Sequence, residues 1–423
     1  MAQVRQFHPS DPSAERGRGT AMAAALRPCR APLATLARID RLAAQRPPQN
    51  VTLNELQERM AKTSKTATPA AFVREARWLQ EELPLRMAQL LADFNRLPFV
   101  ALRCEPLADV WSIYWQELEA LSALPRAESS DHVVRLKDEL LLSQERRSGV
   151  IEAFRQAVGE LRRFPDVQSS LEAFLDKAFV TRIGRLMLED HFVAFVELAA
   201  SGDSGGQPRS DGIVSEVRLV PLLEDVAADI RDLSERVYGC SPKVEIVQTG
   251  DGVVHNIPRY LGFIFREILK NAVKATVERH PVDTPAVQVH VVTGTYDVQV
   301  RISDLGGGMP RRVLKSIWRY GFSGFEVSHP KQETAAGVMD GGHGSQSQTE
   351  LSGYGVGLPL SRLYARHLGG DIVISQVLGH GTEASVFLSR HGIREDFCLG
   401  DSEEPAAETH GALRGRDSMR APF

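Results

Sequence analysis

Residues 266–276 of this 423-residue chain read REILKNAVKAT, and this stretch decides the fold. Glu267 and Asn271 stand four positions apart, so on a helix they stack on one face. A carboxylate at that position can accept a proton, while the neighbouring amide can hold a metal ion. Taken alone, the pair is more typical of a solvated helix surface. The motifs that follow it must therefore decide between the two interpretations.

Three glycine-containing motifs follow this helix along the chain. Asp304 opens the run DLGGG after an alternating strand at 298–303, and glycines there let a ligand approach the backbone. The run GYGVG at 353–357 leads directly into an expected helix at 358–368, whose exposed N–H groups suit a phosphate. GHGT at 379–382 precedes the last strand, where Thr382 could complete a base-binding pocket. Each motif alone is also compatible with an ordinary turn.

The order of these elements resembles the N, G1 and G2 boxes of the ATPase fold shared by bacterial histidine kinases, DNA gyrase, Hsp90 chaperones and MutL. By that resemblance Glu267 is the general base, Asn271 the Mg²⁺ ligand and Asp304 the adenine anchor. The resemblance implies ATP and Mg²⁺ as cofactors. The nucleotide-binding residues that it implies are Asn271, Lys274, Asp304, Gly306, Gly308, Ser323, Gly353, Tyr354, Gly355, Val356, Gly357, Leu358 and Thr382.

Residues 50–200 have a helical pattern. Leu83, Met87, Leu90 and Phe94 recur at steps of four and three, which predicts one apolar helix face that a bundle would bury. The runs RWLQEELPLRMAQ at 77–89, RLPFV at 96–100 and FLDKAFVTRIGRLMLEDH at 174–191 are similar to the regulatory bundle of the mitochondrial 2-oxoacid dehydrogenase kinases. LKNAVKAT at 269–276, RISDLGGGMP at 301–310 and GYGVGLPLSRLYARHLGG at 353–370 resemble the same family.

We therefore expect an α+β protein in which an all-α bundle precedes an α/β sandwich that binds ATP. Residues 1–49 are assigned to a transit peptide or disordered segment, because residues 22–46 are rich in arginine, alanine and leucine with one acid. The bundle spans 50–200, the Gly- and Ser-rich linker 201–212, the kinase domain 213–395 and the tail 396–423. Residues 310–352 end in a Gly- and Ser-rich stretch that is typical of a mobile lid.

Composition limits the alternatives. The chain is 43% hydrophobic and 25% charged with a formal net charge of −4, which gives no general attraction to nucleic acid. Its longest apolar run is about half the roughly 18 residues that a membrane span needs, so no membrane insertion is expected. The four cysteines form neither a CxxC pair nor a zinc-type cluster, which favours a reduced compartment.

The family resemblance implies an ATP-dependent serine kinase of the mitochondrial matrix that inactivates the E1α subunit of a 2-oxoacid dehydrogenase complex. It also implies an E2 lipoyl domain as partner and a homodimer. Two features favour the branched-chain complex over the pyruvate complex. Phe263 stands where pyruvate dehydrogenase kinases usually carry a histidine, and all four tryptophans precede residue 319, so the Asp-Trp tail pair of those kinases is missing. Arg319 replaces an aspartate that is common at the family's potassium site, which leaves potassium binding open.

Two other classes of protein compete with this interpretation. A two-component histidine kinase needs a phosphoacceptor histidine followed by glutamate and later proline, but His132 and His191 are followed by Val133 and Phe192. A non-kinase ATPase clamp of the gyrase or MutL type places the ATPase module first, whereas here a helical domain precedes it. Both classes are disfavoured on these grounds.

Overall fold

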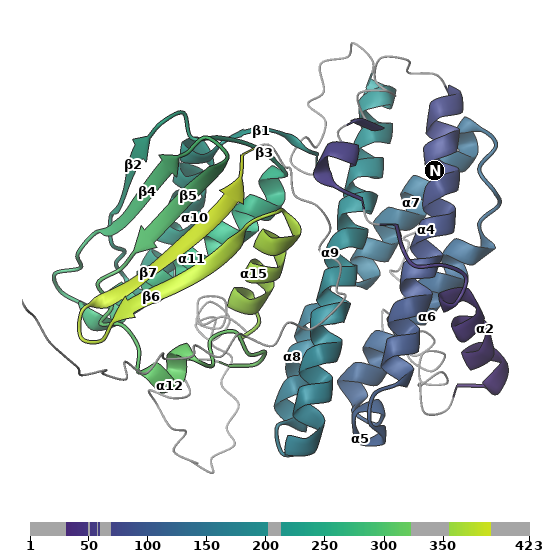
Figure 1. The fold of residues 1–423 in the computed structure, drawn as a ribbon, viewed down its shortest axis with the longest axis horizontal. Helices are drawn as coiled ribbons and strands as arrows, with labels where there is room; N and C mark the ends of the chain where they lie inside the picture. Colours follow the sequence, from purple (N-terminus) through teal and green to yellow (C-terminus); the bar gives the residue numbers. More distant parts are fainter. Residues whose placement is uncertain are drawn as a thin grey trace, which may run out of the picture.

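The computed structural model describes residues 31–49, 51–56, 58–59, 69–201, 213–322 and 355–390. A bundle of long helices lies beside an α/β domain, and the two are in contact along α9 and α15 (Figure 1). The expected fold class, with the all-α part first and the mixed sheet second, is confirmed.

Proline positions set the helix boundaries of the bundle. One helix ends before Pro98, and another begins at Pro165, because a residue before proline is disfavoured in helix. Pro84 lies inside a continuous helix. The predicted apolar face of Leu83, Met87, Leu90 and Phe94 is buried. The helices are α2 (Leu33–Ala43), α4 (Pro69–Asn95), α5 (Phe99–Leu102), α6 (Glu105–Ala123), α7 (Ser130–Arg146), α8 (Val150–Leu161) and α9 (Pro165–Ser201).

Part of the expected transit or disordered segment is helical. Helix α2 packs against α4 and buries Ile39 completely. Arg46, one of the arginines that suggested a presequence, pairs with Glu82 on α4 at 2.8 Å. Residues 31–49 therefore belong to the bundle surface in this structure, because their apolar and basic side chains find partners there. Residues 1–30 lie outside the described residues.

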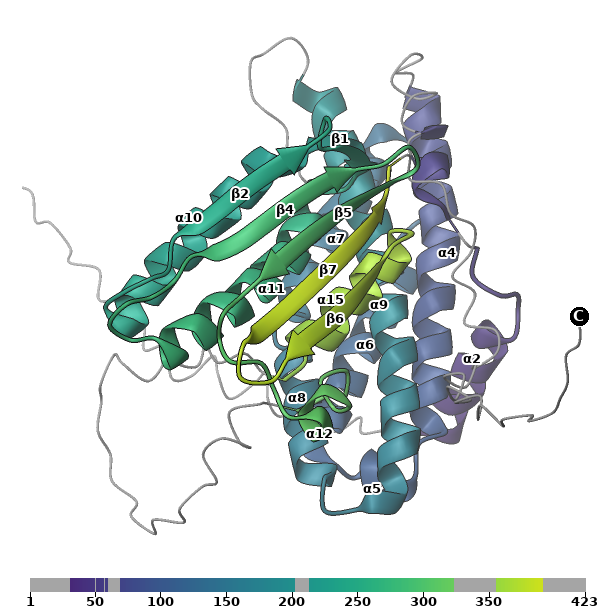
Figure 2. The same ribbon diagram turned by 60° about the vertical axis from the view of Figure 1, so that its left-hand side comes forward.

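The second domain is a five-stranded mixed sheet with helices on one face. Its strand order is β2-β4-β5-β7-β6, in which β2 and β4 are parallel and the other pairs antiparallel. Figure 2 shows α10, α11 and α15 behind the sheet, and none of the described helices packs on the opposite face. The strands are β1 (Ser215–Arg218), β2 (Val244–Thr249), β3 (Val253–Asn256), β4 (Val287–Thr293), β5 (Asp297–Ser303), β6 (Asp371–Val377) and β7 (Gly381–Ser389). The helices are α10 (Leu219–Tyr238), α11 (Pro258–Arg279), α12 (Arg311–Leu314) and α15 (Gly357–His367).

The alternation of buried apolar residues with more exposed ones explains why the strands form where they were predicted. Val287, Val289 and Val291 of β4 are fully buried beneath the helices, while the residues between them face the open side. Strands β1 and β3, which form a separate two-stranded sheet, were not predicted from the sequence. Each has only four residues, and four residues give too short an alternation to recognise.

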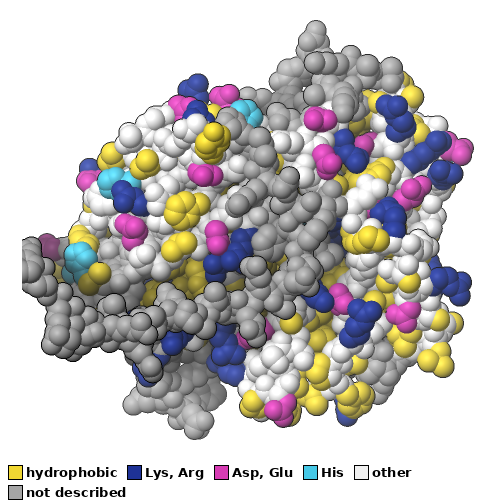
Figure 3. Space-filling view, in the orientation of Figure 1, with side chains coloured by type: hydrophobic (Ala, Val, Ile, Leu, Met, Phe, Trp, Pro, Cys, Tyr) yellow, Lys and Arg dark blue, Asp and Glu magenta, His cyan; other side chains and the backbone are white. Residues whose placement is uncertain are grey.

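The molecular surface is mixed in charge. Lysine and arginine side chains alternate with aspartate and glutamate over the described part of the face in Figure 3. No helix among the described residues combines the length and apolar character that a bilayer span requires.

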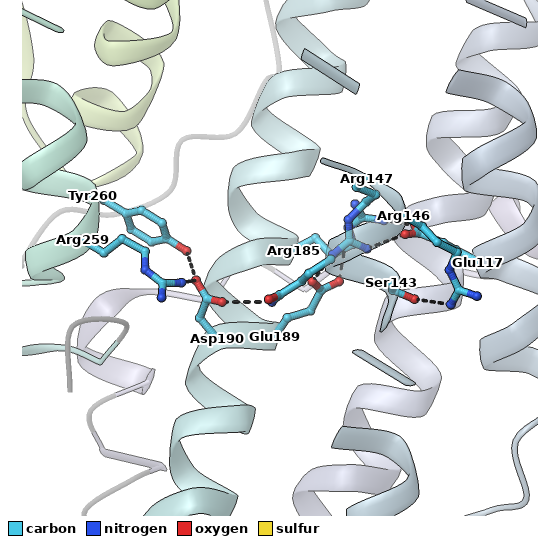
Figure 4. Close-up of polar contacts among 10 residues, drawn as sticks. Glu117, Ser143, Arg146, Arg147, Arg185, Glu189, Asp190, Arg259 and Tyr260 are labelled. Carbon is cyan, nitrogen blue, oxygen red and sulfur yellow. Dashed lines mark hydrogen bonds and ion pairs between the residues drawn. The ribbon is translucent and has the colours of Figure 1, made fainter. Parts of the chain in front are cut away.

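A buried group of four charged side chains lies inside the bundle (Figure 4). Glu117 of α6 accepts hydrogen bonds from Arg147 and from Arg185 of α9, each at 2.9 Å. Glu189, one turn after Arg185, pairs with both arginines. All four residues are at most 2% exposed, so their charges compensate one another away from water.

This group yields a prediction about stability. Glu117→Gln leaves a buried positive charge without its partner, and we expect it to lower the free energy of unfolding by about 3–5 kcal/mol. Chemical denaturation of the full chain measures this. Asp229→Asn is the control, because Asp229 forms an exposed ion pair with Arg266, and exposed pairs contribute at most about 1 kcal/mol. Equal effects of the two changes would contradict the prediction.

Candidate functional site

Helix α11 presents the acidic and amide residues that the sequence singled out. Its apolar side packs under the sheet, which leaves Glu267 half-buried and Asn271 exposed on the side away from the core. The buried positions of that apolar side include Leu261, Ile264, Phe265, Ile268, Leu269 and Ala272. The predicted i, i+4 stacking of Glu267 and Asn271 is therefore realised on a helix fixed by its opposite face.

The Glu267 carboxylate has two close neighbours, Lys270 and Gly357. Lys270 Nζ donates to Glu267 Oε1 at 2.6 Å. A Cβ atom built at Gly357 would lie 2.1 Å from Glu267 Oε2, so only glycine lets the start of α15 come this close. Lys270 was not among the predicted site residues. Its spacing of three from Glu267 was the signal that could have identified it.

The N-terminus of α15 opens toward this carboxylate. Val356 precedes the helix and no side chain caps it. The first intrahelical bond runs from Leu360 N to Val356 O, so the amides of Gly357 and Leu358 have no acceptor within the helix. These amides and the helix dipole favour an anion.

Gly355 is needed where the chain enters α15. Its φ of +70° is favoured only for glycine, and a Cβ there would lie 2.8 Å from the carbonyl carbon of Gly321. The backbone N–H of Gly321 donates to the Gly355 carbonyl at 2.9 Å. Gly321 and Gly355 are thus bonded to each other on either side of residues 323–354, which lie outside the described residues.

Asp304 lies at the end of β5 and is 8% exposed. Its Oδ1 accepts hydrogen bonds from the amides of Gly306, at 2.8 Å, and Thr382, at 3.2 Å. Burial raises the pKa of this carboxyl group, and the two amides partly oppose that rise. No described residue donates a hydrogen bond to its other oxygen, Oδ2. A carboxylate oxygen that the described residues leave without a donor suits a ligand N–H group.

Glycines bring the neighbouring turns against Asp304 and α11. A Cβ at Gly381 would meet the Asp304 carbonyl oxygen at 1.9 Å, and one at Gly306 would meet Ala275 Cβ at 2.5 Å. Gly308 has a φ of +65° and lies against the Val377 carbonyl. The residues DLGGG, GHGT and the helix of Glu267 therefore meet around one region.

The remaining predicted positions are less central or not described. Lys274 lies about one turn beyond Asn271 on α11, with its ammonium group 4.0 Å from a Glu278 carboxylate oxygen, and burial lowers its pKa. Val356 and Leu358 flank Gly357 at the start of α15. Three further predicted residues lie outside the described residues: Ser323, Gly353 and Tyr354.

The segment just before residue 323 contacts the bundle. Arg319, which stands at the family's potassium position, donates from Nε to Glu172 of α9 at 2.9 Å. Tyr320 donates to Asp176 of the same helix. Arg319 thus has an acidic protein partner at the position where the family resemblance implies a potassium site.

This arrangement can hold a small set of chemical groups. Asp304 can accept an N–H group, the start of α15 can bind an anion, and Asn271 can offer an oxygen to a metal ion. Within the described part of the chain, no three His, Cys, Asp or Glu side chains gather in a way that could hold a metal. A Mg²⁺ ion here would therefore need oxygen atoms from a bound phosphate as further ligands.

The buried Asp304 yields a prediction about pH. Because its pKa is raised in the folded chain, the neutral carboxyl favours folding at low pH, and this contribution is lost as the pH rises through the folded pKa. Asp304→Asn keeps a neutral acceptor for the two amides. We expect this variant to be more stable than the wild type at pH 7.5, with the difference shrinking toward pH 4.

Urea denaturation of the ligand-free chain at several pH values measures this difference. Asp297→Asn, at the exposed start of the same strand, is the matched control and should leave the pH dependence unchanged. A constant difference between Asp304→Asn and wild type across the whole pH range would refute the assignment of a raised pKa.

Comparison with known proteins identifies both domains. Residues 51–215 match the family described as mitochondrial branched-chain alpha-ketoacid dehydrogenase kinase. Residues 256–392 match the family described as histidine kinase-, DNA gyrase B-, and HSP90-like ATPase. The two matches cover the bundle and the region of Glu267, Asp304 and Gly357.

The relatives are kinases of one kind. The chain is 32% identical to a probable [pyruvate dehydrogenase (acetyl-transferring)] kinase, mitochondrial, of Caenorhabditis elegans, over 74% of this chain and 77% of the relative. It is 30% identical to the corresponding kinase of Drosophila melanogaster (74% and 76%) and 29% identical to isozyme 1 of Rattus norvegicus (74% and 71%). The chain therefore belongs to the mitochondrial 2-oxoacid dehydrogenase kinase family, whose C-terminal half has the ATPase fold of histidine kinases, DNA gyrase B and Hsp90.

Proposed function

We propose that the chain is an ATP-dependent serine kinase that phosphorylates, and so inactivates, the E1α subunit of a 2-oxoacid dehydrogenase complex in the mitochondrial matrix. One observation carries the proposal. The Glu267 carboxylate lies against Gly357 at the open N-terminus of α15, with Asn271 one turn further along α11. A base, a metal ligand and an anion site thus lie next to one another, which is what phosphoryl transfer requires.

The residues present fit a bound Mg²⁺ and adenine nucleotide. Oδ2 of Asp304 would accept the amino N–H of adenine, while the amides of Gly357 and Leu358 would donate to phosphate oxygens. The exposed Asn271 amide would hold Mg²⁺, whose charge offsets that of the phosphates. Positioning and electrostatics therefore supply most of the expected rate enhancement.

Glu267 would orient or deprotonate the serine hydroxyl of the protein substrate. Its Oε1 is bonded to Lys270, which fixes the carboxylate and leaves Oε2 facing the start of α15. We assign Lys270 the role of holding Glu267 in this orientation. A carboxylate restrained in this way loses little freedom when the reaction begins.

The protein substrate is the E1α subunit of either the pyruvate or the branched-chain complex. The names of the relatives favour pyruvate dehydrogenase E1α. Phe263, whose ring centre lies 5.1 Å from that of Tyr364, replaces the histidine expected in pyruvate dehydrogenase kinases and favours the branched-chain E1α. Because the relatives match over three quarters of the chain, we expect pyruvate E1α to be the better substrate and keep branched-chain E1α as the second candidate.

A histidine kinase is a weaker interpretation. His191 is 5% exposed, and burial lowers its pKa to about 4. His132 Nδ1 accepts a hydrogen bond from the Glu128 amide at the start of α7. A phosphoacceptor histidine needs an accessible ring, so the burial of His191 supports transfer to another protein.

The uncovered face of the sheet supports a homodimer. Val247, Val373 and Phe387 on three of its strands are 48%, 47% and 37% exposed, and a second copy could cover them. An E2 lipoyl domain is proposed as partner of the bundle from the family alone. Potassium is not part of the proposal, because Arg319 has Glu172 as its partner at that position.

Glu267→Gln tests the proposed base. Since the amide cannot accept the hydroxyl proton, we expect phosphoryl transfer to E1α to fall by at least about 100-fold. Nucleotide affinity, measured by calorimetry with Mg²⁺ and ADP, should change less than threefold. Glu278→Gln, on the exposed surface of the same helix, is the matched control. Transfer by Glu267→Gln at the wild-type rate would show that the base is another residue.

A competition assay tests the substrate. Purified pyruvate and branched-chain E1α are mixed with the kinase and labelled ATP, and phosphoserine on each subunit is measured over time. We expect pyruvate E1α to be labelled at least about tenfold faster, a preference equal to about 1.4 kcal/mol in transition-state stabilisation. Faster labelling of the branched-chain subunit would reverse the order of the two candidates.

A further inference from the structure

Asp190 of α9 joins the bundle to the first turn of α11. Its Oδ2 accepts hydrogen bonds from Arg259 Nη1 at 2.9 Å and from the Tyr260 hydroxyl at 3.0 Å. Its Oδ1 accepts from Gln144 Nε2 of α7 at 3.0 Å. Figure 4 shows Asp190 between the two α11 side chains and the buried charges of the bundle. One carboxylate therefore connects two bundle helices with the helix that carries Glu267.

Ion pairs inside the bundle fix the position of Asp190. Its neighbour Glu189 pairs with Arg147 and Arg185, and both arginines bond to Glu117. These pairs tie α9 to α6 and to the end of α7, where charges removed from water resist separation. Asp190 is thus presented to α11 from a rigid part of the bundle.

Apolar packing does not set the alignment of α9 and α11 at this place. A cavity of about 280 Å³ borders Asp190, with Leu186, Arg182, Phe263 and Tyr364 among its walls. Close-packed side chains would define the spacing of two helices by themselves. Beside this cavity, the directed hydrogen bonds of Asp190 are the direct contacts that hold α9 against α11.

The contact reaches both helices of the candidate active site. Tyr260 and Glu267 are seven residues, or about two turns, apart on α11. The Tyr260 ring also lies 5.1 Å from the ring of Tyr364 in α15, the helix whose first residue, Gly357, faces Glu267. A shift at Asp190 would therefore move the carboxylate and the anion site together.

We propose that Asp190 is a positioning residue for phosphoryl transfer, which holds α11 and α15 in register with the bundle. The inference rests on the proposed kinase function and adds a residue distant from the reacting atoms. Because the nucleotide-binding groups belong to the ATPase domain, loss of Asp190 should leave nucleotide affinity nearly intact. It should instead misalign Glu267 with a protein substrate held by the bundle, and so lower kcat.

The test compares Asp190→Ala, Asp190→Asn and Tyr260→Phe in the full chain. We expect kcat for E1α phosphorylation to fall at least tenfold in Asp190→Ala, less in Asp190→Asn, which keeps an acceptor, and least in Tyr260→Phe. KM for ATP should stay within threefold of wild type in all three. Asp229→Asn, which removes the exposed partner of Arg266 on α11, is the control and should keep the wild-type kcat.

Hydrogen exchange of the α11 amides gives a second readout that does not depend on the substrate. We expect the amides of residues 258–268 to exchange faster in Asp190→Ala than in the wild type, with exchange in α10 unchanged. If Asp190→Ala does not fold, the same measurement is made on Tyr260→Phe. Wild-type kcat in Asp190→Ala, a rise in KM for ATP that accounts for the whole loss, or unchanged exchange in α11 would each overturn the inference. Absence of E1α phosphorylation by the wild type would refute the proposed function instead, and exchange would still decide whether Asp190 holds α11.

Discussion

The approach of Glu267 to Gly357 is the constraint on which the candidate site depends. A side chain at residue 357 would collide with the carboxylate, so the two helices meet only because one of them begins with glycine. This contact places an acid beside open amides. Asn271 lies near this contact because it follows Glu267 on α11. Asp304 directly follows β5, which packs against α11.

Buried charged groups are arranged differently in the two domains. In the bundle, Glu117, Arg147, Arg185 and Glu189 compensate one another in a dry interior, which fixes how α6, α7 and α9 pack. In the ATPase domain, the Asp304 carboxylate is buried with only two backbone donors, and its other oxygen has none among the described residues. The four charges of the first arrangement balance one another within the protein, whereas the second arrangement is suited to receiving a ligand.

Contacts between the domains link these two arrangements. Asp190 connects the interior of the bundle to α11, and Tyr320 and Arg319 connect the residues before 323 to α9. The bundle therefore contacts α11 and the residues at the start of the segment that the sequence marks as a lid. A protein bound to the bundle would have physical routes to the nucleotide site through these side chains.

The sequence alone predicted the fold class, the α11 pair and the glycine motifs, because helical and strand periodicity and short motifs are local properties. It did not predict the short strands β1 and β3, the helical state of residues 33–43, the pairing of Lys270 with Glu267 or the role given to Asp190. These depend on residues far apart in the chain or on which of several charged neighbours is within reach. Only the tertiary structure brings Asp190 to Arg259 across 69 positions, since burial and hydrogen-bond geometry are decided when the domains pack.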